Sequence, residues 1–253
     1  MTKQRIIHIV WILTLLPLLV LLLGNVEKAY KAKEIQDIQV IIDNQVGNYF
    51  VSDEEIVRLL TEGGRRMIVG APYENIDLKT LESELEDHPF VQDAEVYRDL
   101  KGNLIARIEQ CKPVARLSSD QRPDRYISDR GKLLPVSGNY TARVLILRGN
   151  LGGETEANDI TSTESGRNIL ELLRYIDSDR FWKAQIAGME VDRKGCVILY
   201  PQVGRQRIEF GRPEQFGEKF RKLQIFYKEI LPKAGWNAYA RVNVEFKDQI
   251  VCE

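Results

Sequence analysis

The residues best suited to nucleophilic or metal chemistry are scarce in this chain of 253 residues, which contains two histidines and three cysteines. His8 lies inside an apolar run, and His88 directly precedes a proline, a position that disfavours helix. Because no Ser or Cys partner can be identified, we interpret His88 as a structural cap at a helix end. The cysteines lie in or beside apolar strand-like runs, and we expect small buried hydrophobes at Cys111, Cys196 and Cys252.

Sequence motifs of the common catalytic sites are also missing. The sequence contains no G-x-S-x-G, H-E-x-x-H, C-x-x-C or Walker A pattern. The 36 basic residues are balanced by 37 acidic ones, which argues against a broad nucleic-acid-binding surface. The sequence therefore predicts a protein that is not an enzyme and that has no catalytic, cofactor-binding or metal site.

The longest apolar run begins at Ile6 and ends at Leu23, and its 18 residues carry no formal charge. As a helix it would reach about 27 Å, close to the ~30 Å hydrocarbon core of a bilayer. Lys3 and Arg5 precede it, so the positive-inside rule places the N-terminus in the cytoplasm and the rest of the chain on the far side.

A cleaved signal peptide is the alternative interpretation of this run. The run is longer than the ~7–15 residues of a typical signal core, and no A-x-A cleavage site follows it. We therefore expect a cytoplasmic tail over residues 1–5, an uncleaved transmembrane anchor over residues 6–26, and a juxtamembrane spacer over residues 27–37.

Residues 38–112 are predicted to form a first domain with the order β-α-α-β-β. A β-branched run at residues 38–42 indicates a strand, and residues 104–111 alternate as a strand does. Ser52, with a glutamate three residues later, matches a capping box, and Asp77 can cap a second helix. Two helices on one face of a small sheet make an α+β fold.

Residues 113–253 are predicted to form a mostly antiparallel β domain with helices. Short strand-like runs are separated by Gly, Pro and Asp, whereas apolar stripes at residues 169–176 and 216–230 indicate helices. Residues 240–246 alternate in polarity, so we expect a strand whose valines and phenylalanine share one face. A turn and an apolar chain end at residues 250–252 follow.

Five stretches resemble the bacterial cell-division family FtsQ, called DivIB in Gram-positive bacteria. They are FVSDEEIVRLL and HPFVQDAEVYRDLKGNLIARIEQCKPVARL, then YISDRGKLLP, RQRIEFGRPEQFGEKFRKLQIFY and ARVNVEFKDQIV. Each stretch alone is a weak signal, but their order behind one anchor is fairly specific and covers nearly the whole chain. The resemblance implies that residues 38–112 form a POTRA domain and that residues 113–253 form a β domain with a C-terminal partner-binding strand.

The resemblance also implies a function and a location. FtsQ-like proteins are non-enzymatic scaffolds that recruit the FtsB–FtsL coiled-coil pair to the septum and help to regulate septal peptidoglycan synthesis. By this resemblance the chain is a single-pass inner-membrane protein with periplasmic domains, enriched at the division septum. Its expected partners are FtsB/FtsL-like membrane proteins, other divisome proteins and the lipid bilayer, with no nucleic acid.

The family binds its partner through its last strand and through the Gly-Arg before its last helix. Carried over by motif, the resemblance implies partner contacts at Arg212, Glu245, Phe246, Ile250 and Val251. Arg212 could pair with an acidic partner residue, and Phe246 could be a buried aromatic anchor. A purely structural interpretation stays open for each: Phe246 in the core, Arg212 solvated, and the apolar chain end covered by the protein's own sheet.

Two other functions are compatible with parts of the sequence. One is a POTRA-bearing protein of outer-membrane translocation or assembly, although such proteins usually carry several POTRA repeats before a barrel. The other is an anchored periplasmic hydrolase, which would need a pair of carboxylates clustered in a cleft.

Overall fold

The computed structural model describes residues 33–43, 47, 49–119, 122–138, 140–149, 151 and 158–253. The anchor predicted over residues 6–26 lies outside these residues, and within them no helix has the length and apolar character needed to cross a membrane. The chain divides into two compact units, residues 1–45 with 51–110 and residues 46–50 with 111–253.

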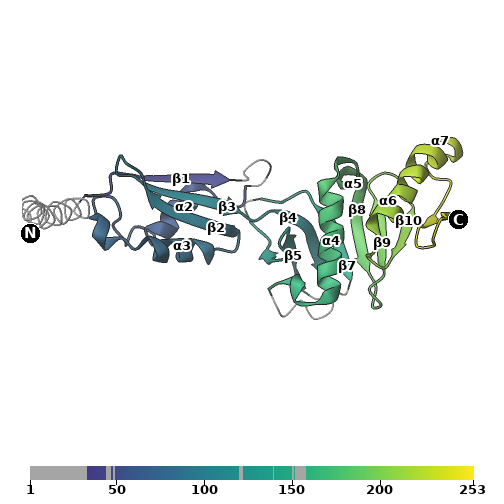
Figure 1. The fold of residues 1–253 in the computed structure, drawn as a ribbon, viewed down its shortest axis with the longest axis horizontal. Helices are drawn as coiled ribbons and strands as arrows, with labels where there is room; N and C mark the ends of the chain where they lie inside the picture. The colour runs from purple at the N-terminus through teal and green to yellow at the C-terminus, as the bar shows by residue number, and fades with distance from the viewer. Residues whose placement is uncertain are drawn as a thin grey trace, which may run out of the picture. The chain divides into compact units, whose positions relative to one another are not determined.

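The first unit is a three-stranded sheet with two helices, and it confirms the predicted β-α-α-β-β order (Figure 1). Strand β1 pairs in parallel with β3, and β2 pairs antiparallel with β3, which gives the order β1-β3-β2. The elements are β1 (Ile38–Asp43), α2 (Asp53–Leu60), the short 3₁₀ helix η1 (Tyr73–Asn75), α3 (Leu78–Glu86), β2 (Val91–Arg98) and β3 (Leu104–Gln110).

Both helices of the first unit begin where the sequence places a cap. The side chain of Ser52 accepts a hydrogen bond from the Glu55 N–H at 3.3 Å, and Asp77 accepts from the Lys79 N–H at 3.1 Å. These bonds satisfy N–H groups that have no partner within the helix. The helices turn apolar stripes inward and form a small core with the sheet, whose members include Ile56, Leu60, Leu81, Leu85, Val96, Leu104 and Ile108.

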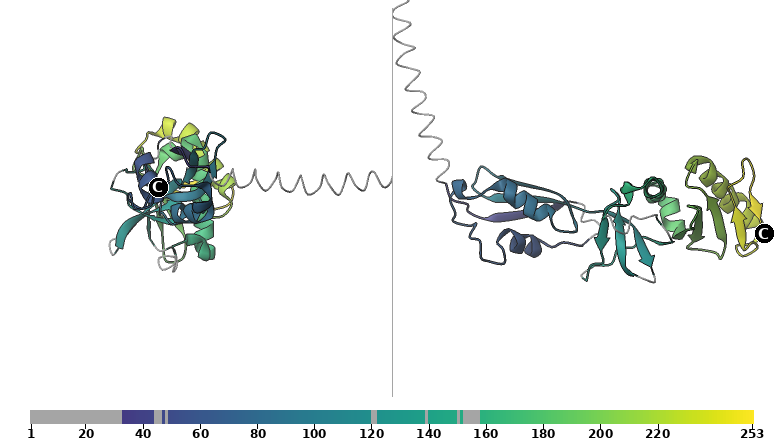
Figure 2. Two further views of the ribbon diagram at one scale, coloured as in Figure 1. Left: turned by 90° about the vertical axis from the view of Figure 1, so that its left-hand side faces the viewer. Right: turned by 90° about the horizontal axis from the view of Figure 1, so that it is seen from below.

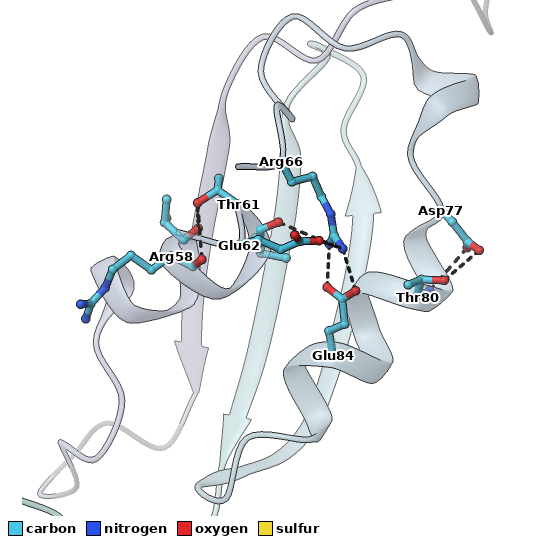
Figure 3. A network of polar contacts seen from close by, with 9 residues as sticks. Arg58, Thr61, Glu62, Arg66, Asp77, Thr80 and Glu84 are labelled. Atoms are coloured by element: carbon cyan, nitrogen blue, oxygen red, sulfur yellow. Dashed lines mark hydrogen bonds and ion pairs between the residues drawn. The ribbon is translucent and has the colours of Figure 1, made fainter. Parts of the chain in front are cut away.

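A polar network joins the loop after α2 to helix α3 (Figure 3). The guanidinium of Arg66 donates two hydrogen bonds to the Glu84 carboxylate, at 2.6 and 2.7 Å, and a third to Glu62. These contacts raise the pKa of Arg66 and lower the pKa of Glu84, because each charge stabilises the other. The paired guanidinium therefore ties the loop to the helix.

The second unit is built around a nine-stranded sheet with the order β12-β11-β10-β9-β8-β7-β4-β5-β6. Of its eight neighbouring pairs, five are antiparallel and three are parallel, namely β4–β7, β7–β8 and β10–β11. The strands are β4 (Pro113–Ser119), β5 (Arg122–Ser128), β6 (Leu133–Pro135), β7 (Leu145–Gly149), β8 (Ile186–Val191), β9 (Val197–Pro201), β10 (Arg207–Gly211), β11 (Arg241–Asn243) and β12 (Val251–Cys252).

Helices in this unit cross between parallel neighbours of the sheet. The helices are η2 (Ile160–Ser162), α4 (Glu164–Ser178), α5 (Arg180–Gln185), α6 (Phe216–Ile225), the π-helical η3 (Phe226–Ile230) and α7 (Leu231–Ala234). Chain order places α4 and α5 between β7 and β8, and α6 between β10 and β11. Tyr175 of α4 stacks on Phe220 of α6 with ring centroids 4.8 Å apart, and both helices contribute to one core with the strands.

Three details of the sequence prediction were wrong. The strand expected over residues 240–246 ends at Asn243, because the Asn243 side chain accepts a hydrogen bond from the Glu245 N–H at 2.9 Å and turns the chain. Phe246 therefore does not share the buried face of its neighbouring valines. The predicted helix at residues 216–230 contains a π-helical turn and continues beyond Pro232 to residue 234. Two cysteines expected to be buried are only half-buried, Cys196 and Cys252.

Candidate partner-binding edge

The large sheet has two edge strands, β6 and β12, and no other described strand pairs with the outer side of β12 (Figure 2, yellow). Arg241 and Glu253 exchange two backbone hydrogen bonds, at 2.9 and 3.0 Å. Because bonded and non-bonded pairs alternate along an antiparallel ladder, the next pair, Val242 and Cys252, is non-bonded. The backbone N–H and C=O of Cys252 therefore face the outer edge, where another strand can bind them.

Side chains on β12 alternate between the two faces of the sheet. Ile250 and Cys252 are half-buried and pack against the core, whereas Val251 between them belongs to the opposite face. The protein's own core therefore covers part of Ile250, one of the residues expected to contact a partner. Val251 is also half-buried, but it is not among the side chains that pack against that core.

The turn before β12 exposes Phe246, the aromatic residue expected to contact a partner, to solvent. Val242 and Val244 are fully buried, whereas Phe246 is 49% exposed. The alternative that Phe246 belongs to the core is therefore wrong. An exposed aromatic side chain beside an open strand is the kind of group that anchors protein interfaces.

Two segments far apart in the sequence meet beside this turn. Gly211 ends β10 with a positive φ of 71°, and a Cβ built there would lie 2.7 Å from the Cδ atom of Glu245. The side chain of Glu245 therefore rests on the backbone of Gly211, and the exposed Arg212 follows directly. The parallel pairing of β10 with β11 explains this meeting, because both strands end at the same side of the sheet.

Sequence reasoning missed two lysines of α6 that hold these segments. The Lys222 ammonium donates hydrogen bonds to the carbonyls of Val244 and Phe246, at 2.6 and 2.7 Å. The Lys219 ammonium donates to the Arg212 carbonyl at 2.7 Å. One helix thereby fixes both the turn after β11 and the loop after β10. No sequence pattern marks lysines that bind distant backbone carbonyls.

The environment of Lys219 is unusual for a lysine. Its residue is only 6% exposed, and its Nζ atom lies 4.9 Å from the centre of the Phe210 ring. Burial lowers the pKa of Lys219 because the charged form loses water, and the nearby Glu245 carboxylate opposes part of that shift. The Lys219 ammonium thus lies beside both segments, bonded to the Arg212 carbonyl and close to the Glu245 carboxylate.

Neither a metal-binding cluster nor an unexplained histidine is found among the described residues. No group of three or more His, Cys, Asp or Glu residues there could hold a metal ion. His88 follows α3, its N–H donates to the Leu85 carbonyl, and its Nε2 atom lies 3.5 Å from a Glu55 carboxylate oxygen. These contacts agree with the structural role predicted for His88.

Both units match known protein families. Residues 112–253 match the family described as FtsQ/DivIB, C-terminal related, and residues 34–109 match the POTRA-like domain. The chain is 25% identical over 187 residues to the cell division protein FtsQ of Rhodothermus marinus, which covers 72% of this chain and 67% of that protein. The first family spans more than half of the sequence, with the sheet edge described above inside it. This chain therefore belongs to the FtsQ/DivIB family of cell-division proteins.

Proposed function

We propose that this chain is a non-enzymatic scaffold of the division machinery that recruits an FtsB–FtsL-like coiled-coil pair to the septum. In this role it helps to regulate septal peptidoglycan synthesis. The observation that carries the proposal is the open edge of β12 within the domain that matches the FtsQ/DivIB family. Residues 6–23 would anchor the scaffold in the inner membrane, with both domains in the periplasm.

Strand addition is the mode of binding that this edge supports best. The outward N–H and C=O of Cys252 offer one donor and one acceptor to an extended partner segment. Val251 lies on one face of the growing sheet, and the exposed Phe246 lies at its end. The main-chain bonds would supply affinity, and the side chains would select the partner.

Charge supplies a second element of recognition. Arg212 is exposed, and its guanidinium makes no ion pair with a carboxylate of the described residues. It follows directly on Gly211, against which Glu245 packs, so an acidic partner residue would bind Arg212 at the end of the added strand. Ile250 contributes through the core that supports β12. We thus propose Arg212, Glu245, Phe246, Ile250 and Val251 as the partner-binding residues.

Substitutions to glutamate test the side chains of this site. Phe246→Glu and Arg212→Glu should leave the protein folded but abolish capture of the FtsB–FtsL-like pair in a pull-down. Ile225→Glu and Arg221→Glu are matched controls, because both residues are exposed on α6 and should leave capture unchanged. Unchanged capture by both site variants would remove the assignment.

A proline substitution tests strand addition itself. Cys252→Pro removes the outward N–H without removing a bond to β11, so it should weaken capture strongly while thermal unfolding changes little. Cys252→Ala keeps the N–H and should bind normally. In cells, crosslinkers placed along residues 240–253 should capture a small coiled-coil membrane protein.

The proposed membrane topology has its own test. Alkaline phosphatase fused after residue 30 should be active, and GFP fused there should be dark, because the fusion point would lie in the periplasm. Fluorescent GFP at this position would contradict the orientation. The match of residues 112–253 to the FtsQ/DivIB family favours the division scaffold over the two other functions, outer-membrane assembly and hydrolysis.

A further inference from the structure

Three of the large apolar side chains that are exposed in the POTRA-like unit lie in two of its loops. Leu100 is fully exposed at the tip of the β2–β3 hairpin, Met67 is 83% exposed, and Val69 is 49% exposed in the loop after α2. Exposed apolar groups that gather in one place mark surfaces that contact another apolar phase.

Backbone hydrogen bonds bring these two loops together around the first described residues. On one side, Ile35 donates to the Ala71 carbonyl at 3.0 Å and accepts from the Gly70 N–H at 2.8 Å. On the other side, the Gln36 N–H donates to the Gly102 carbonyl at 2.9 Å. Residues 33–36 thus run between the loop that carries Met67 and Val69 and the hairpin tip that carries Leu100.

Specific contacts hold both loops in place, so the exposure of their tips does not come from missing structure. Arg66, directly before Met67, is clamped to Glu84 of α3 (Figure 3). In the hairpin, the Asp99 carboxylate accepts a hydrogen bond from the Asn103 N–H at 2.8 Å, which lowers the pKa of Asp99.

The position of residue 33 in the sequence limits how far these tips can lie from the end of the apolar run. Only nine residues separate Lys33 from Leu23, the end of the apolar run, and a fully extended chain spans about 3.4 Å per residue. This end of the unit therefore lies within roughly 34 Å of the bilayer surface when residues 6–23 span it. The opposite end of the sheet is about 20 Å farther along β3 (Leu104–Gln110).

The charged residues at this end of the unit do not form a surface of one sign that could attract a partner by charge alone. Lys101 and Arg65 make no ion pair with a described carboxylate, but Glu34 and Glu74 lie on the same end of the unit. The charges are mixed, so burial of apolar area is the main attraction that this surface offers. Amphipathic surfaces of this type bury their apolar groups about 5–10 Å into the boundary between headgroups and acyl chains.

We propose that Met67, Val69 and Leu100 insert into the outer face of the bilayer that holds the anchor. The proposal rests on the membrane anchoring given above as part of the proposed function. Docking would hold the POTRA-like unit against the membrane at two loops in addition to the chain itself. The nearby bilayer is the occupant that the short connection to residue 23 favours over a soluble partner or a second copy.

Depth-dependent quenching in a reconstituted membrane tests the proposal. The full chain, with Cys196→Ser and Cys252→Ser, carries a fluorophore on Leu100→Cys, while the buried Cys111 stays unlabelled. It is reconstituted into liposomes of phosphatidylethanolamine and phosphatidylglycerol that contain a lipid spin-labelled near the headgroup. We expect quenching severalfold stronger than for the same label on Asp87→Cys, an exposed position at the far end of the sheet.

A second variant distinguishes docking of the loops from insertion of the fluorophore itself into the membrane. Met67→Ser with Val69→Ser should reduce quenching at position 100 to the level at position 87, while the unfolding temperature stays unchanged. Equal quenching at positions 100 and 87 in a chain that floats with the liposomes would overturn the docking proposal and leave the anchor intact. Quenching that survives the double substitution would also overturn it. A chain that fails to float with the liposomes would refute the anchor and the docking together.

Discussion

Removing the ammonium of Lys222 should loosen the partner-binding hairpin while the rest of the domain stays intact. This ammonium donates hydrogen bonds to the Val244 and Phe246 carbonyls, at 2.6 and 2.7 Å, and so closes the turn between β11 and β12. Hydrogen bonds from charged groups are worth about 1.5–3 kcal/mol, and partial exposure reduces this to about 1 kcal/mol each. Lys222→Met should therefore favour local opening of the hairpin by about 2 kcal/mol, or roughly 30-fold.

Amide hydrogen exchange measures this opening directly and needs no partner. In Lys222→Met, the amides of Arg241 and Glu253, which donate to each other's carbonyls, should exchange roughly 30-fold faster, whereas those of β9 (Val197–Pro201) should keep their protection. Lys228→Met is the matched control, because Lys228 is an exposed lysine on the following π-helical turn and donates to neither of the carbonyls that Lys222 binds. Unchanged exchange of the Arg241 and Glu253 amides would refute the role assigned to Lys222.

Three further substitutions test the packing and charge of the two units. Gly211→Ala should lower the free energy of unfolding by about 1–2 kcal/mol, measured by urea denaturation, because Gly211 has a positive φ and the new methyl group would clash with Glu245. Adding Glu245→Ala should restore the part of the loss that comes from the clash. Glu84→Gln should cost about 0.5 kcal/mol at neutral pH and nothing at low pH. Arg66 lowers the pKa of Glu84 below its ordinary value of 4.5, so the stabilisation is present above that pH and is lost as the carboxylate takes up a proton at lower pH. A pH series of unfolding curves that stays parallel to the wild type would contradict this. Leu223→Ala should cost about 2–5 kcal/mol, measured by thermal or chemical unfolding, because Leu223 is fully buried in the core of the second unit.

Local signals in the sequence determined most of the POTRA-like unit. Ser52 and Asp77 mark helix starts because a side-chain oxygen can bind N–H groups within the next few residues. The order of strands and helices follows from the spacing of apolar residues, which is also a short-range property. The parallel pairing of β1 with β3 could not be predicted in this way, because it joins residues more than sixty positions apart.

The same distinction divides the candidate site. The resemblance to the family located the last strand and Arg212, but alternation alone assigned Phe246 to the same face as Val242 and Val244. That prediction failed because the Asn243 side chain accepts a hydrogen bond from the Glu245 N–H and so ends the strand. Beyond this turn, the alternation of apolar and polar residues no longer determines which face a side chain occupies.

The sequence by itself thus determined the helix starts, the order of elements and the short fragments that identify the family. Only the tertiary structure decided which strand forms the edge of the sheet, that Glu245 rests on Gly211, and that Lys219 and Lys222 bind backbone carbonyls. The physical reason is the range of the interactions. Caps and apolar stripes act within a few residues, whereas an edge, a clamp and an exposed side chain depend on which distant segments fold beside them.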